Sequence, residues 1–204
     1  MANRIIISGN VVIEPEYSHR KYGDEMYMFT ISSRRLSGTE DFIPVLIHKR
    51  KLCEEITYGN RIKVIGEIRT HSFVANGENR TCLLVLANEI DEPEEMDENY
   101  VELDGWMCKE PFYKKTTLTR KRITDFMVSS KRNHGSNDYI PCIVWSGCAG
   151  FARHLDVGTY LALIGRLQSR EYQKTMENGE IETRIVYEVS ARSLDVLEWS
   201  EENG

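Results

Sequence analysis

The sequence predicts an all-β protein made of two small five-stranded barrels in tandem. Two observations lead to this prediction: the 204-residue chain repeats one pattern twice, and short runs with strand-like alternation dominate each copy. The repeat offset is 96 residues between Asn3 and Asn99 and grows in steps to 104 between Ala87 and Ala191. An offset that grows only between strand-like segments is what loop insertions produce. Short structural repeats have periods of about 20–50 residues, so a period near 100 indicates two copies of a whole domain.

The first two strands of each copy follow from β-branched and alternating runs. Residues 4–8 and 100–104 predict the first strand, and Gly9 and Gly105 follow these runs. Residues 26–32 alternate between two sets of side chains, which is the period of a strand with one core face.

Three further strands complete each copy. The third is expected at residues 41–48 and 138–146, the fourth at 61–68 and 159–167, and the fifth at 81–87 and 183–191. Gly66 and Gly165 lie inside the fourth strands, where glycine commonly marks the bulge or bend that curls a sheet. Asn76-Gly77 and Asn178-Gly179 follow, and Asn-Gly is a strong hairpin-turn dipeptide.

One short helix is expected between the third and fourth strands, at residues 51–56 and 150–155. Five strands with a helix in this place are typical of the OB-fold, a small barrel that binds oligonucleotides across one face. The predicted domains are a first OB-fold at residues 1–90, an acidic linker at 91–98, a second OB-fold at 99–199 and a tail at 200–204.

The acidity of the chain belongs to the linker. The net charge is −6, divided as +1 over residues 1–90, −6 over 91–98 and −1 over 99–204. Each domain is near neutral, so a basic face that binds nucleic acid would have to be local. The linker is interpreted as a hydrated spacer, with the alternative that it keeps nucleic acid away from the seam between the domains.

Cysteine use and hydropathy predict a soluble cytoplasmic protein. The five cysteines are odd in number and form no CxxC pair, which favours free thiols in a reducing compartment. No apolar run is long enough for a membrane span, and the N-terminus lacks the pattern of a signal peptide.

Several motifs resemble the bacterial single-stranded DNA-binding protein family. Residues 165–172, with Asn178-Gly179 and residues 187–194, resemble the final strands of that family, and Asn3 with residues 15–16 and 29–35 resembles its opening. Between the two copies the resemblance covers nearly the whole chain. It implies sequence-nonspecific binding of single-stranded DNA in replication, repair or recombination, without a cofactor. The usual member carries one such domain and forms a tetramer, so a fused pair implies a homodimer with four barrels.

The resemblance also places the rings on which bases would stack. They are Phe42, His48 and Phe73 in the first copy and Tyr139, Trp145 and Tyr172 in the second. His48 departs from the aromatic carbocycles at the other five positions. The alternative interpretation is that these rings belong to the core.

Basic residues recur around these rings in both copies and are the expected phosphate contacts; the alternative is a merely solvated charged face. They are Arg20, Lys21, Lys114, Lys115, Arg120, Lys121 and Arg122 between the first two strands, Arg34, Arg35, Lys131 and Arg132 at the end of the second, and Arg69, Arg166 and Arg170 on the fourth. Salt-sensitive binding follows, because each neutralised phosphate releases counterions.

Other function classes remain as alternatives. An enzyme is not expected, because the histidines show no metal-ligand spacing and the chain has no phosphate-binding loop or nucleophile elbow. The family's long tail, whose acidic tip recruits replication and repair proteins, has no counterpart after Trp199, so recruitment by that route is not expected. The alternatives are a primosomal OB-type adaptor protein and an OB-fold protein-interaction module that has lost DNA binding.

Overall fold

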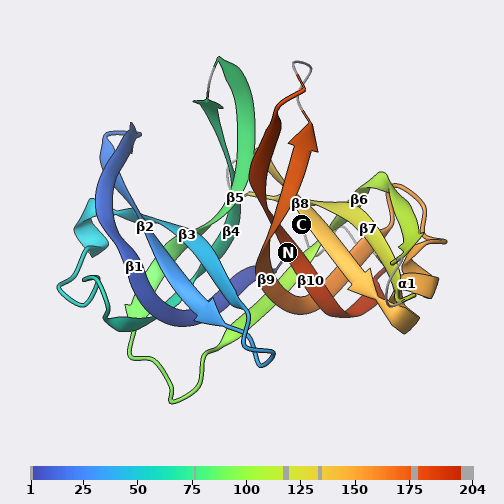
Figure 1. The fold of residues 1–204 in the computed structure, drawn as a ribbon, viewed down its shortest axis with the longest axis horizontal. Helices are drawn as coiled ribbons and strands as arrows, with labels where there is room; N and C mark the ends of the chain where they lie inside the picture. The colour runs from blue at the N-terminus through green and yellow to red at the C-terminus, as the bar shows by residue number, and fades with distance from the viewer. Residues whose placement is uncertain (1, 76, 117–119, 133–134, 176–178, 199–204) are drawn as a thin grey trace.

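Two five-stranded barrels make up the protein (Figure 1). The computed structural model describes residues 2–75, 77–116, 120–132, 135–175 and 179–198. The predicted tandem OB-fold is confirmed. The proposed tail at residues 200–204 lies outside the described residues, as do Asn76 and Asn178 of the two predicted turns.

The two barrels have the same strand pairing. In the first barrel β1 pairs with β2 and β4, and β3 pairs with β2 and, in parallel, with β5. The pairing of β4 with β5 then closes the barrel. The second barrel repeats this with β6 to β10. The strands are β1 (Asn3–Lys21), β2 (Asp24–Arg34), β3 (Glu40–His48), β4 (Arg61–Ala75), β5 (Glu78–Asp91), β6 (Asn99–Lys115), β7 (Arg122–Lys131), β8 (Asn137–Trp145), β9 (Tyr160–Thr175) and β10 (Ile181–Val196).

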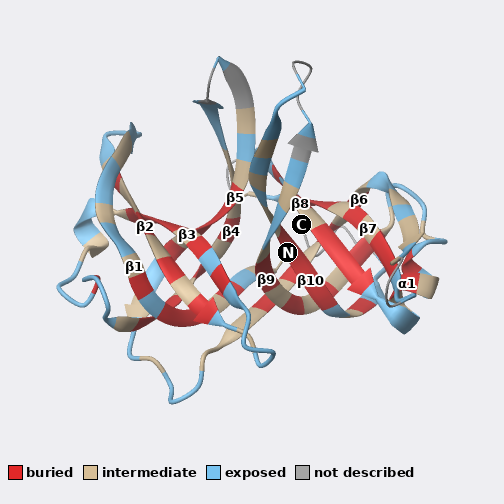
Figure 2. Ribbon diagram, viewed as in Figure 1, coloured by how far each residue is buried: buried red, intermediate tan, exposed pale blue. Residues whose placement is uncertain are grey.

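Alternation along the strands builds the core. Ile43, Val45 and Ile47 of β3 point inward and are fully buried, and the matching inward positions of β8 are also buried. Figure 2 shows buried segments along the barrel walls and exposed ones at the loops and at the two projecting hairpins. These hairpins, β4–β5 and β9–β10, lie next to each other (Figure 1). Arg80 of the first forms an ion pair with Glu182 of the second at 3.0 Å.

The first strand of each copy does not end at its glycine. β1 and β6 continue past Gly9 and Gly105, and the neighbouring strand passes very close to both glycines. A Cβ atom added to Gly9 would lie 2.2 Å from the carbonyl oxygen of Ser32, and one on Gly105 would lie 2.5 Å from that of Ser129. These glycines therefore permit a close strand approach and not a turn.

The glycines of the fourth strands behave as predicted. The register between β4 and β5 shifts at Ile65/Gly66, and the register of β10 shifts just after Ala191, the partner of Gly165. In the hairpins that follow, Gly77 and Gly179 have φ angles of 78° and 84°, values that favour glycine.

The helix between the third and fourth strands differs between the copies. It is α1 (Ser146–Ala152) in the second copy but only a 3-10 turn, η1 (Lys49–Lys51), in the first, and both begin earlier than predicted. Three bases fill η1 and no acid lies in its first turn, which opposes the helix dipole. By contrast, α1 buries Ala149 and Ala152. No helix of the described residues is long and apolar enough to span a membrane.

A strand pair joins the two barrels into one ten-stranded sheet. β1 runs antiparallel to β6, with Ile5 opposite Val101, Asn3 opposite Leu103 and Ile7 opposite Asn99. Ile5 and Val101 are matched residues of the two copies. The joint therefore has the two-fold arrangement of a symmetric dimer interface within one chain.

The acidic linker lies against the first barrel. Asp97 accepts hydrogen bonds from the Arg61 Nε (3.1 Å) and from the backbone amide of Arg34 (2.8 Å). Asp91, the last residue of β5, pairs with Lys63 at 3.3 Å. The linker acids thus neutralise bases of the first barrel, and the linker is more than a hydrated spacer.

Candidate nucleic-acid interface

Strand alternation turns the predicted stacking residues of β3 and β8 outward. Phe42 and His48 share the outer face of β3, and Tyr139 and Trp145 share that of β8, while the residues between them alternate into the core. About half of the Phe42 and Tyr139 surfaces is exposed, at 47% and 52%. These two rings are therefore available to a ligand and are not core residues.

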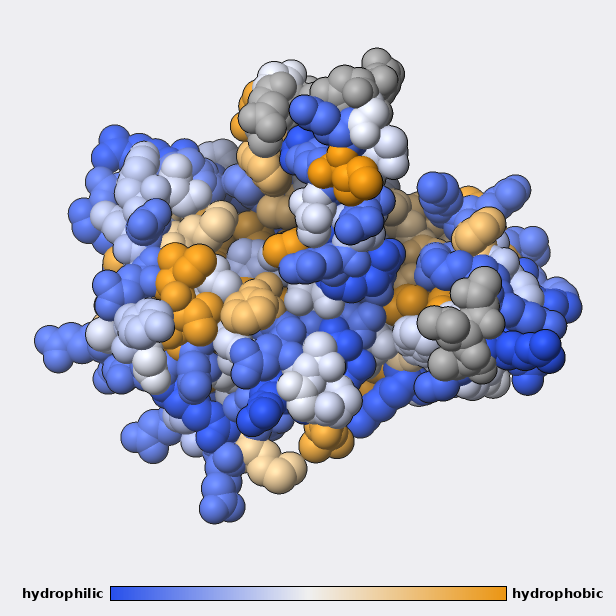
Figure 3. Space-filling view, in the orientation of Figure 1, coloured by the Kyte–Doolittle hydropathy of each residue, from blue (hydrophilic) through white to orange (hydrophobic). Residues whose placement is uncertain are grey.

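Three of the six predicted rings line one groove, although they come from different copies. Phe73 projects from the β4–β5 hairpin of the first barrel, and Tyr139 and Tyr172 belong to the second barrel. Their groove has a volume of about 1280 Å³, and we call it the ring groove. Phe73 is 40% exposed. On the face drawn in Figure 3, small hydrophobic patches lie within a largely hydrophilic surface, over the first barrel and on the projecting hairpins.

Trp145 lies in a second groove of about 800 Å³, which we call the tryptophan groove. Its indole is 38% exposed and its Nε1 donates a hydrogen bond to the Ser190 Oγ at 3.3 Å, which fixes the ring without covering it. The charged residues that line this groove are mainly bases: Arg34, Arg35, Lys121, Arg166 and Arg192, against one acid, Asp97. Burial, and then the nearby Arg35 charge, lower the pKa of Arg166.

His48 and Phe42 lie outside both grooves. His48 lines a small pocket of about 320 Å³ with Asp24, Lys49 and Arg50, and its Nδ1 is 3.4 Å from the Asp24 carboxylate. Burial, and then the Arg50 charge, lower the pKa of His48, so the imidazole is largely neutral at pH 7.

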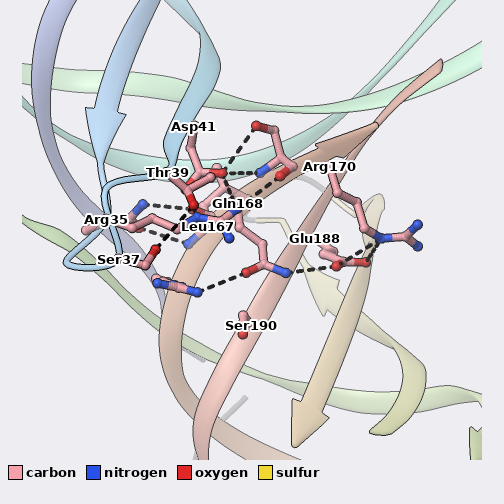
Figure 4. Close-up of polar contacts among 12 residues, drawn as sticks. Arg35, Ser37, Thr39, Asp41, Leu167, Gln168, Arg170, Glu188 and Ser190 are labelled. Atoms are coloured by element: carbon pink, nitrogen blue, oxygen red, sulfur yellow. Dashed lines mark hydrogen bonds and ion pairs between the residues drawn. The ribbon is translucent and has the colours of Figure 1, made fainter. Parts of the chain in front are cut away.

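Three of the predicted phosphate contacts are engaged instead in ion pairs at the barrel–barrel interface. Arg35 donates to the fully buried carboxylate of Asp41, with its Nε at 2.6 Å, and Asp41 also accepts the backbone amide of Ser169 at 2.7 Å (Figure 4). The matched arginine, Arg132, and Arg69 both donate to the buried carboxylate of Asp138. Their guanidinium groups are thus occupied by acids of the chain.

The remaining predicted cations fall into two groups. Four are engaged elsewhere. Arg20 pairs with Glu25, Lys114 with Asp125, and Arg166 donates to Gln168. Arg170 pairs with Glu188 (Figure 4). The others make no ion pair within the described part of the chain, and they are Lys21, Arg34, Lys115, Arg120, Lys121, Arg122 and Lys131. Most of this second group lies at or near the β6–β7 hairpin of the second barrel.

Three residues of the ring groove were not predicted from the sequence. Arg80, Arg184 and Tyr187 line it from β5 and β10, where Arg80 and Arg184 both pair with Glu182. Alternation along the fifth strands could have shown which of their side chains face outward, because side chains two positions apart lie on the same face of a strand. Their meeting across the barrels had no sequence signal.

The comparisons with known proteins agree with this architecture. A model of the single-strand binding protein family matches residues 2–92 and again residues 98–197. The chain belongs to the single-strand binding protein family. Each match covers one barrel of this family member, so the duplication seen in the sequence is a duplication of the family's domain.

Relatives of this single-strand binding family member include proteins with one domain and with two. "Single-stranded DNA-binding protein 1" of Clostridium acetobutylicum is 33% identical over 97 residues, which cover 44% of this chain and 88% of the relative. The crystal structure of wild-type single-stranded DNA binding protein from Thermus aquaticus has a TM-score of 0.76 at 19% identity and covers 98% of this chain and 94% of its own. A deletion mutant of the same Thermus protein matches equally, with a TM-score of 0.76. These two structures support the tandem fold.

Proposed function

We propose that this protein binds single-stranded DNA with little sequence preference and serves replication, repair or recombination. The observation that carries the proposal is the ring groove, in which Phe73, Tyr139 and Tyr172 from two barrels face one open space. The family membership supports the same function, and the relative from Clostridium acetobutylicum is named for it.

Stacking explains why sequence preference is expected to be weak. Base–aromatic stacking contributes about 1–3 kcal/mol per base and tolerates any base, because every base has a π-face. The rings project from strand walls, whose backbone polar groups are engaged in the sheet ladders. The strand backbones are therefore not free to read base edges, and the rings would stack on any base.

Cations of the second barrel would bind the phosphates. Lys121, Arg166 and Arg192 line the tryptophan groove beside Trp145, and Arg120 and Arg122 flank Lys121 in the chain. We therefore place the main DNA contacts on the second barrel and in the ring groove, with a smaller part for His48 and Phe42.

Fluorescence anisotropy of a labelled oligo-dT at about 50 and 200 mM salt tests the proposal. The logarithm of single-strand affinity falls with the logarithm of the salt concentration, with a slope of about −0.7 for each phosphate that the protein neutralises. We expect micromolar or tighter binding that weakens steeply with salt, similar binding of a mixed-sequence oligonucleotide, and much weaker binding of a duplex of the same length. An unchanged anisotropy at micromolar protein would favour the protein-interaction alternative.

A further inference from the structure

Two buried carboxylates lie at the contact between the barrels, at matched positions of the two copies. Asp41 begins the inward face of β3 and Asp138 that of β8, and both side chains are fully buried. Each accepts hydrogen bonds from an arginine of its own barrel and from the hairpin of the other barrel. We call these arrangements the first clasp (Asp41, Arg35 and Ser169) and the second clasp (Asp138, Arg132 and Thr70).

The second clasp is the more extensively bonded. The Asp138 Oδ1 accepts the backbone amide of Thr70 at 2.6 Å and its hydroxyl at 2.8 Å, and Oδ2 accepts Arg132 Nε at 2.8 Å and Arg69 at 2.9 Å. Arg132 in turn donates to the Thr70 carbonyl at 3.0 Å. Burial would raise the pKa of Asp138, but the hydrogen bonds from Arg132, Thr70 and Arg69 outweigh it and lower the pKa. The carboxylate is therefore charged and fully engaged at neutral pH.

The first clasp repeats this geometry. Ser169 donates its amide to Asp41 at 2.7 Å and its hydroxyl at 3.2 Å, and Arg35 donates to the Ser169 carbonyl at 3.0 Å. A displacement of one barrel against the other would separate these partners and leave a buried charge without a partner. Because that is energetically costly, the network tolerates little displacement of the two barrels.

The clasps lie directly beside the rings. Asp138 precedes Tyr139, and strand alternation buries the first while the second faces the ring groove. Thr70 is three residues before Phe73 on β4, and Thr70 and Arg132 also line the groove. The hydrogen bonds of Asp138 thus tie β4, which carries Phe73, to β8, which carries Tyr139.

We propose that Asp138 is a positioning residue that assembles the ring groove by holding the first barrel's hairpin across the second barrel, with Asp41 acting as its counterpart in the first clasp. No DNA contact by Asp138 is involved. The consequence for DNA rests on the proposed function, whereas the positioning itself does not.

Hydrogen exchange tests the positioning without DNA. Because the Thr70 amide is bonded to Asp138, Asp138→Asn should speed amide exchange of peptides that cover residues 69–74 by about tenfold, although the substitution lies in the other barrel. Asp195→Asn, an exposed change on β10, is the control and should leave these peptides unchanged. If Asp138→Asn fails to fold, Thr70→Val removes one donor to the clasp and should give a smaller change of the same sign. Unchanged exchange in the folded variant overturns the proposal.

A double-mutant cycle with oligo-dT tests the consequence for binding. In the wild-type background Phe73→Ala should lower the affinity for oligo-dT. In the Asp138→Asn background this loss of affinity should be at least about threefold smaller, because a misplaced ring already contributes less to binding. The loss caused by Trp145→Ala should stay the same, because Trp145 lies in the other groove. Equal Phe73→Ala losses in both backgrounds overturn the proposal. If the wild-type protein does not bind oligo-dT, the proposed function fails and the exchange measurement alone decides the clasp.

Discussion

Trp145 and His48 occupy matched ends of β8 and β3, but their surroundings differ. The indole faces a basic groove, whereas the imidazole lies beside Asp24 in a small pocket and offers less ring area. Trp145→Ala should therefore weaken oligo-dT binding by about 1–3 kcal/mol, and His48→Ala by less. Tryptophan emission should fall on binding, and Trp145→Phe should remove most of that response. Full affinity in Trp145→Ala would withdraw this ring from the site.

His71 makes a pH-dependent contribution to stability. Its ring stacks with those of His19 and Phe73, at centroid distances of 5.4 and 6.3 Å. Burial, and then the charges of His19 and Lys21, lower the pKa of His71. The pKa of a histidine in an unfolded chain is about 6.5. Below that pH the unfolded chain binds a proton more readily than the folded protein does, and this lowers the free energy of unfolding. The contribution is complete above this value and is lost as the pH falls toward the lower, folded pKa. Urea unfolding at pH 7.5 and 5.5 should show a smaller fall for His71→Gln than for the wild type; equal falls would contradict this account.

At the scale of the elements, the strand glycines close the barrels. A Cβ atom on Gly165 of β9 would lie 2.4 Å from the carbonyl oxygen of Ser190, which is backbone and cannot move aside. Gly165→Ala should lower the free energy of unfolding by about 1–3 kcal/mol through overpacking. Gly147→Ala is the matched control, because it lies in α1 with no atom near the added Cβ and should be neutral or stabilise by up to about 1 kcal/mol. Thermal unfolding of both variants measures this, and equal stabilities would refute the close-approach explanation.

At the scale of the whole molecule, each barrel closes on itself, and the β1–β6 pair already joins two barrels within the chain. Further association can therefore use the barrel faces or the outer edges of the projecting hairpins, where residues 70–75 and 168–175 make no other strand pairing within the described residues. One two-fold axis would bring four barrels together, and we expect a homodimer of about 47 kDa, twice the 23.6 kDa of one chain. Light scattering at working concentration measures this mass. A value near that of one chain would leave a monomer with two barrels.

Much of the architecture followed from patterns within single segments. The duplication, the order of the strands and the bends at Gly66 and Gly165 were predictable, because alternation and glycine chemistry act over a few residues. The first, fourth and fifth strands of each copy nevertheless run several residues beyond their predicted bounds. The helices were predicted less well, since the first copy forms only the η1 turn, which consists of three bases. The outward direction of Tyr139 and Trp145 was predictable in the same way from the period of β8.

The partners of the arginines depended on the tertiary structure. Arg35 and Arg132 look in the sequence like the free bases Arg34 and Lys131 beside them, and nothing local tells them apart. Asp138 meets Thr70 across 68 residues of chain, and contacts between the barrels, such as the pairing of β1 with β6, bring these two segments together. Whether a base is free for phosphate or is engaged by a buried acid depends on such distant contacts, which local propensity does not encode. For the same reason the rings assigned to separate copies proved to share one groove.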